Sequence, residues 1–219
     1  MSSSLRTGMA PFKIKFQEKG IVKDIKKIIV RIDGLPSCLN GQIVDFGDQN
    51  RGIIMGFSEQ DVLALVLGDE SRVRIGQQVS GISEPFTIPV GEQFIGRMVD
   101  ALGQPCDTGG PLKADTFSGV FNPSPTLTER APVDQPLHTG TKILDVLVPI
   151  GKGQRELILG DRMTGKTVIA VDAMLNQSDK NVVCIYCCIG KAVSALEKVL
   201  LALSEHSALE YSIIIAATD

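Results

Sequence analysis

The sequence has few residues that could stack against nucleic-acid bases and no surplus of positive charge. It contains no tryptophan and only two tyrosines, and its net charge is −3 with a pI near 5.5. Proteins that bind nucleic acid usually carry a basic surface, and single-strand binders add aromatic side chains on which bases stack. We therefore expect no nucleic acid among the partners of this chain.

Long apolar runs and targeting signals are also lacking. No apolar stretch approaches the roughly 18 residues that a membrane-spanning helix needs, so we expect any link to a membrane to be made through partner subunits. Residues 1–12 have neither the apolar core of a secretion signal nor the repeated arginines of a transit peptide. We expect a flexible N-terminus there.

The cysteine pattern argues against disulfides and zinc. The chain has five cysteines, an odd number. Three of them, Cys184, Cys187 and Cys188, lie in the apolar run 182–189, which predicts a buried central strand. Because no second Cys/His pair completes a zinc site, we expect these three thiols to be buried and structural.

Residues 13–90 predict a first domain made of strands. Short apolar segments alternate there with turn residues, which is typical of a small antiparallel barrel or sandwich. The run 62–67 is too continuously apolar for a strand with one solvent-facing side, and predicts either a subunit contact or a strand buried on both faces. The expected strands are 21–22, 28–32, 42–46, 53–57, 62–67 and 78–82.

Residues 91–219 predict a second domain of the α/β class. Prolines at four positions between 121 and 139 exclude a regular helix and predict an extended surface segment. Strands and helices then alternate, which predicts a parallel sheet with crossover helices. The expected elements are a short helix within 139–147, a buried strand at 156–159, a helix at 168–175, a strand at 182–189, a helix with a Ser194/Glu197 capping box, and a strand at 211–217.

One stretch carries the chemistry, because residues 160–167 fill every fixed position of the phosphate-loop pattern GxxxxGKT. The loop consists of Gly160, Asp161, Arg162, Met163, Thr164, Gly165, Lys166 and Thr167. A strand, a glycine loop and a helix in that order direct backbone N–H groups and the positive helix end at a phosphate. Lys166 then reaches the terminal phosphates and Thr167 ligates Mg²⁺. The loop predicts binding of a nucleoside triphosphate.

The amino-acid sequence around this loop resembles the sequences of one protein family. The run from Pro149 to Thr167, with its GDRxTGKT loop, looks like the alpha subunit of F-type ATP synthases, and most like bacterial versions. The segments 96–103, 135–140 and 184–190 support the resemblance along nearly the whole chain. It implies an N-terminal six-stranded β-barrel (13–90) followed by an incomplete P-loop NTPase domain of the RecA-like type (91–219).

The resemblance also implies a function. The phosphate loop would be a non-catalytic, regulatory site for ATP or ADP with Mg²⁺ in the head of an ATP synthase coupled to proton or sodium transport. The partners would be beta subunits in an alternating hexamer, with gamma and delta subunits. The complex would lie peripherally at the cytoplasmic face of a bacterial inner membrane, or on a mitochondrial or plastid membrane.

Two residues depart from the family pattern. Lys191 stands where alpha subunits usually have glutamine and beta subunits place the glutamate that activates water. A lysine ammonium cannot act as a general base, so we expect the isolated chain to be catalytically inactive; Lys191 either contacts phosphate or faces solvent. Met163 also replaces a usual glutamine, which predicts weakened affinity.

The resemblance covers less than half of a family member. We therefore expect a truncated subunit that lacks the magnesium-binding aspartate strand and the C-terminal helical domain and is poorly stable alone. The alternatives are a regulatory or non-functional truncated paralogue that binds partner subunits without supporting synthesis, an RNA-translocating hexameric ATPase, and a free-standing NTPase.

Overall fold

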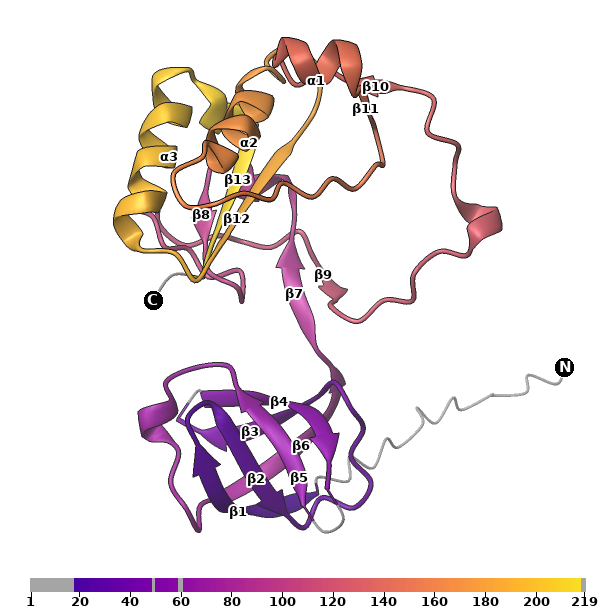
Figure 1. The fold of residues 1–219 in the computed structure, drawn as a ribbon. Helices are drawn as coiled ribbons and strands as arrows, with labels where there is room; N and C mark the ends of the chain where they lie inside the picture. Colours follow the sequence, from indigo (N-terminus) through magenta and orange to yellow (C-terminus); the bar gives the residue numbers. More distant parts are fainter. Residues whose placement is uncertain (1–17, 49, 59–60, 218–219) are drawn as a thin grey trace, which may run out of the picture. The chain divides into compact units, whose positions relative to one another are not determined.

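A computed structural model describes residues 18–48, 50–58 and 61–217, which form two compact units (Figure 1). The first unit extends to residue 87 and includes residues 119–121, and the second contains residues 88–118 and the chain from 122 onward. The expected flexible segment 1–12 lies outside the described residues. Within the described part of the chain, no helix has both the length and the apolar character needed to cross a membrane.

The first unit is the predicted six-stranded barrel. Its strands pair only with antiparallel neighbours and close in the order β1-β2-β5-β4-β3-β6. The strands are β1 (Lys19–Lys26), β2 (Ile29–Asp33), β3 (Gln42–Gly47), β4 (Asn50–Phe57), β5 (Val62–Val66) and β6 (Gln78–Pro85). Closure satisfies the backbone groups that an open sheet would leave unpaired at its edges.

Alternating burial explains why these residues form a barrel. In β2, Val30 and Ile32 point inward and are fully buried, whereas Ile29 and Arg31 are exposed. Each strand of this kind places every second side chain in one shared core. In β5 the outward side chains Leu63 and Leu65 are half-buried, so this strand is not buried on both faces.

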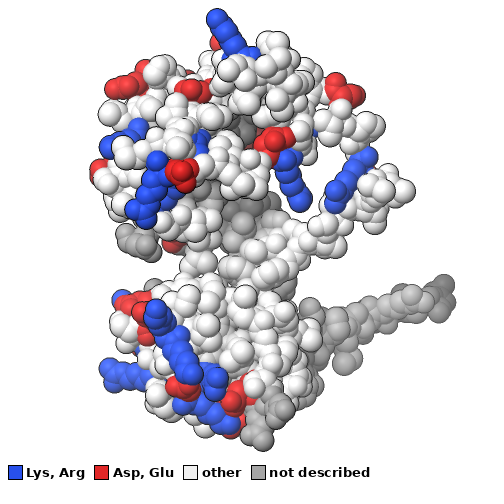
Figure 2. Space-filling model, in the orientation of Figure 1, with Lys and Arg blue, Asp and Glu red and all other residues white. Residues whose placement is uncertain are grey.

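The outer surface of the barrel carries charges of both signs close together, as the face shown in Figure 2 illustrates. The Lys23 ammonium lies 2.8 Å from a carboxylate oxygen of Asp61 and 3.3 Å from one of Asp33. These two contacts raise the pKa of Lys23. Ion pairs this exposed contribute little to stability, so the barrel depends on its apolar interior.

The second unit is built around a parallel sheet of three strands in the order β12-β13-β8. Its main elements are β8 (Met98–Val99), α1 (Lys142–Leu147), α2 (Lys166–Leu175), β12 (Cys184–Ile189), α3 (Val193–Glu205) and β13 (Ser212–Ala217). The shorter pairs are β7 (Thr87–Val90) with β9 (Thr116–Gly119), and β10 (Pro136–Leu137) with β11 (Ile150–Gly151). The participation of β8 was not predicted, because two residues are too short for a periodic signal.

The two long helices pack on this sheet as predicted. Leu196, Val199 and Leu203 of α3 are buried in one apolar cluster with residues of α2 and β12 and with Ile214 of β13. Their spacing places them on one face of the helix. The proline-bearing segment 121–139 contains no α-helix and its side chains are mostly exposed, in agreement with the predicted extended segment.

The predicted strand at 156–159 is wrong. Residues 152–165 form no strand in the structure, and Leu157 and Leu159 are 78% and 80% exposed. Its apolar composition favours a strand, but a strand exists only where a neighbouring strand accepts and donates its backbone hydrogen bonds. No strand among the described residues pairs with this segment.

Two smaller predictions in the same unit are also wrong. The helix α3 begins at Val193 with Ala192 as its N-cap, and no side chain caps it, so the Ser194/Glu197 capping box does not form. Cys187 is exposed, whereas Cys184 and Cys188 are buried as predicted. The capping box fails because the helix begins before Ser194, which therefore lies inside its first turn. Cys187 is exposed because only one face of β12 is covered by helices, and successive side chains of a strand point to opposite faces.

A bidentate ion pair closes the loop that follows β8. Arg97 donates from Nε and Nη2 to the two carboxylate oxygens of Asp107 at 2.7 and 2.6 Å. The same carboxylate accepts the backbone N–H groups of Met98 and Gly109 at 2.8 and 3.0 Å. The guanidinium and these donors hold the pKa of Asp107 well below its usual range.

We predict that Gly52→Ala destabilises the barrel by about 1–3 kcal/mol. A Cβ on Gly52 would lie 2.6 Å from the Phe46 ring and 2.9 Å from the Leu65 carbonyl oxygen. The measurement is the urea midpoint of the barrel, followed by circular dichroism. The control is Gly56→Ala in the same strand, where a Cβ meets nothing within 4 Å. Equal midpoints for the two variants would contradict the predicted clash.

We predict that Asp107→Asn destabilises the second unit at pH 7 by about 1–3 kcal/mol. Because folding lowers the pKa of Asp107, its carboxylate stabilises the fold fully above the unfolded value of about 3.9 and progressively less as pH falls below it. The difference in unfolding free energy between wild type and variant should therefore shrink from pH 7 to pH 3. Urea titrations at both pH values measure it, with the exposed Asp134→Asn as control. A difference independent of pH would refute the prediction.

Candidate functional site

The phosphate loop leads directly into α2, as the sequence pattern requires. The helix begins at Lys166, and its N-cap, Gly165, has a left-handed backbone with φ 90°. No acidic side chain lies in the first turn of α2. The free N–H groups and the positive end of the helix dipole therefore face the loop without a neutralising carboxylate, which favours an anion.

The Lys166 side chain folds back onto the loop. Its ammonium donates to the carbonyl oxygen of Gly160 at 2.7 Å and to the carbonyl oxygen of Asp161. The Thr164 hydroxyl donates to the same Asp161 carbonyl at 2.9 Å. In this conformation the lysine is bonded to loop carbonyl oxygens, so a phosphate would have to displace it from them.

Met163 occupies an unusual position in the loop. Its backbone is left-handed with φ 63°, and its side chain is fully exposed at 102%. A left-handed conformation costs a residue with a Cβ about 1–2 kcal/mol relative to the right-handed one. The methionine side chain offers no contact in return, so the sequence at this position opposes the loop conformation.

The carboxyl end of α2 is held by polar contacts of three side chains, Asn176, Gln177 and Tyr211. Asn176 Nδ2 and Gln177 Nε2 donate to the carbonyl oxygen of His138 at 2.7 and 2.9 Å. The Tyr211 hydroxyl donates to the Met174 carbonyl at 3.2 Å, next to the start of β13. The sequence analysis did not predict this anchor; its only signal in the sequence is the pair of amide side chains, Asn176 and Gln177, directly after an apolar helix.

A groove of about 550 Å³ lies between α2 and α3. Apolar side chains such as Val171 and Val199 line it, together with Asp172, Lys198 and Thr167.

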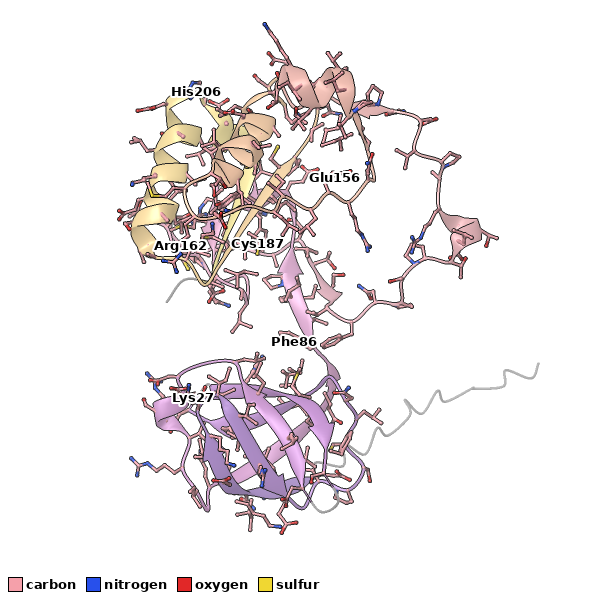
Figure 3. All side chains as sticks on the ribbon, in the orientation of Figure 1. Lys27, Phe86, Glu156, Arg162, Cys187 and His206 are labelled. Atoms are coloured by element: carbon pink, nitrogen blue, oxygen red, sulfur yellow. The ribbon has the colours of Figure 1, made fainter. Side chains whose placement is uncertain are left out.

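Figure 3 shows Arg162 of the phosphate loop and His206, which follows α3, at opposite ends of the second unit. The phosphate loop therefore lies at the end of this unit away from His206.

The described residues fit a nucleotide better than a protein-bound metal. A Cβ on Gly165 would meet nothing within 4 Å, so a ligand can approach the helix end closely. No group of three or more His, Cys, Asp or Glu side chains that could hold a metal occurs in the described part of the chain. A Mg²⁺ ion here would take the Thr167 hydroxyl, phosphate oxygens and water as ligands, a set that Mg²⁺ accepts.

Comparison with known proteins identifies the family of both units. Residues 15–81 match the model described as ATP synthase alpha/beta family, beta-barrel domain, and residues 140–219 match that family's nucleotide-binding domain. The chain belongs to the ATP synthase alpha/beta family. This confirms the resemblance inferred from the sequence, and with it a barrel followed by part of a nucleotide-binding domain.

Two similar proteins within this family are alpha subunits. The chain is 44% identical over 198 residues to ATP synthase subunit alpha 1 of Pseudoalteromonas atlantica, covering 90% of this chain and 38% of that protein. It is 41% identical over 203 residues to ATP synthase subunit alpha 2 of Nitrosospira multiformis, covering 93% and 40%. The chain thus spans about two fifths of the length of these relatives.

We predict that Met163→Gly makes the second unit more stable than Met163→Ala by about 1 kcal/mol. Both variants remove the exposed side chain, but only glycine adopts the left-handed backbone without steric cost. Urea-induced unfolding of the second unit compares the two proteins directly. An alanine variant as stable as the glycine variant would mean that the loop does not hold residue 163 in this conformation.

Proposed function

We propose that this chain binds ATP or ADP with Mg²⁺ at the phosphate loop and does not hydrolyse it. The observation that carries the proposal is the loop Gly160–Thr167 at the start of α2, whose first turn bears no acidic residue. Lys166 would contact the terminal phosphates, and Thr167 would ligate Mg²⁺. The remaining loop residues, Asp161 to Gly165, would enclose the phosphates through their backbone.

The proposed absence of hydrolysis depends on the chemistry of Lys191. By the resemblance, Lys191 would stand where a catalytic subunit has the glutamate that activates water. A lysine ammonium donates hydrogen bonds and accepts none, so it cannot take a proton from water. General-base catalysis contributes about 10²- to 10⁴-fold to the rate of such reactions. The site is therefore a regulatory binding site.

We further propose that the chain serves as an alpha-type subunit of an ATP synthase head. Its partners would be beta subunits, alternating with it in a hexamer, and the gamma and delta subunits. The complex would couple ATP synthesis to proton or sodium transport, lying peripherally on the cytoplasmic face of a bacterial inner membrane. The identity to two bacterial alpha subunits supports this role.

Nucleotide binding is tested by titrating the full chain with ATP and with ADP in the presence of Mg²⁺. We predict that Lys166→Ala lowers the affinity for ATP at least tenfold, because each hydrogen bond to a charged phosphate contributes about 1.5–3 kcal/mol. The control is Lys152→Ala, which removes an exposed lysine outside the loop. Equal affinity in the two variants would exclude the loop as the binding site.

The absence of catalysis and the assembly role are tested separately. Phosphate release by the isolated chain should not exceed background; turnover abolished by Lys166→Ala would overturn the non-catalytic role. Co-expression with matching beta and gamma subunits, followed by purification of the complex, tests assembly. A chain that never copurifies with them would not be a subunit of the head.

A further inference from the structure

The amino ends of α2 and α3 lie at the same edge of the sheet. The carboxyl end of α2 is bonded to Tyr211, which directly precedes β13, and α3 also ends just before this point. Because β12 and β13 are parallel, both helices run from the carboxyl ends of these strands back toward their amino ends. The phosphate loop and the residues before α3 therefore meet at one edge.

Lys191 is fixed at this edge by the backbone. The preceding Gly190 donates its N–H to the carbonyl oxygen of Ala217 at the carboxyl end of β13, at 2.9 Å. One residue after Lys191, Ala192 caps α3 without a side-chain hydrogen bond. Lys191 is exposed, and it makes no ion pair or side-chain hydrogen bond to any described residue.

The edge carries more positive than negative charge. Arg162, Lys166 and Lys191 lie there, whereas the first turns of α2 and α3 contain no acidic residue. Asp161 is the one carboxylate of the phosphate loop. Lys166 is already bonded to loop carbonyl oxygens, which leaves Arg162 of the loop and Lys191 opposite it as cations with no ion pair to a described residue; of the two, Lys191 lies outside the loop, at the residue that the backbone fixes between β12 and α3.

We propose that Lys191 binds the terminal phosphate of the nucleotide and makes the site prefer triphosphates to diphosphates. This inference rests on the proposed nucleotide binding. A lysine ammonium is a flexible point charge that suits a phosphate oxygen. A cation directed at the outermost phosphate stabilises ATP and leaves ADP, which lacks that phosphate, nearly unaffected.

The test is equilibrium binding of Mg-ATP and Mg-ADP to the full chain and its variants. Lys191→Gln should lower the affinity for ATP about fivefold to tenfold and the affinity for ADP less than twofold. Lys191→Arg should keep the preference for ATP, because it retains the charge. The matched control is Lys180→Gln, which removes the same charge in the turn between α2 and β12, at the opposite edge of the sheet.

The outcomes separate this inference from the proposed function. If the wild-type chain binds neither nucleotide, the proposed function fails and this inference fails with it. If the wild type binds both but Lys191→Gln behaves like Lys180→Gln, the role of Lys191 is overturned and nucleotide binding stands. An equal loss of ATP and ADP affinity in Lys191→Gln would place the lysine at an inner phosphate and overturn the triphosphate preference.

Discussion

The burial of α2 and α3 against one face of β12 and β13 is the constraint on which the second unit depends. The cluster brings together Val171 and Met174 of α2, Leu203 of α3, and Cys188 and Ile214 of the strands. It fixes the direction of both helices relative to the strands. The amino end of α2, and with it Lys166 and Thr167, is thereby held at the edge where an anion can be bound.

The same packing leaves the approach to the phosphate loop unsupported. Residues 156–159 precede the loop without pairing to any described strand, and the loop bonds mainly to itself through Lys166 and Thr164. When a ligand binds only one conformation of a loop, its apparent affinity falls with the fraction of molecules that adopt that conformation. If the nucleotide binds as we propose, its binding and the release of Lys166 from the loop carbonyl oxygens should be thermodynamically coupled, each favouring the other.

How far the sequence predicts this structure depends on where the determining contacts lie. The barrel strands follow from alternation along each strand, as at Val30 and Ile32, and the face of α3 follows from the spacing of Leu196, Val199 and Leu203. Both signals are local. The state of residues 156–159 and of Cys187 is decided by which strand or helix covers them, and a local pattern contains no information about that neighbour.

At the candidate site, too, the sequence predicts the local features and not those that depend on neighbouring elements. The eight residues of the loop and the start of the helix after it are readable from spacing alone, because the chemistry of a phosphate requires them in that order. Three features of the site cannot be predicted from spacing, since each depends on the folded backbone. They are the hydrogen bonds of Lys166 to loop carbonyl oxygens, the left-handed backbone of Met163 and the lack of a described partner for Lys191.

The positive charges at this edge of the sheet would favour binding of a nucleotide over its hydrolysis. Hydrolysis needs an acceptor for the proton of the attacking water, and the residue fixed after β12 is a lysine, which has no acceptor. The same cation that removes the base adds attraction for the phosphates. If the nucleotide binds as we propose, a lysine at this position would attract the phosphates without supplying a base for hydrolysis, as the proposed binding role of the site requires.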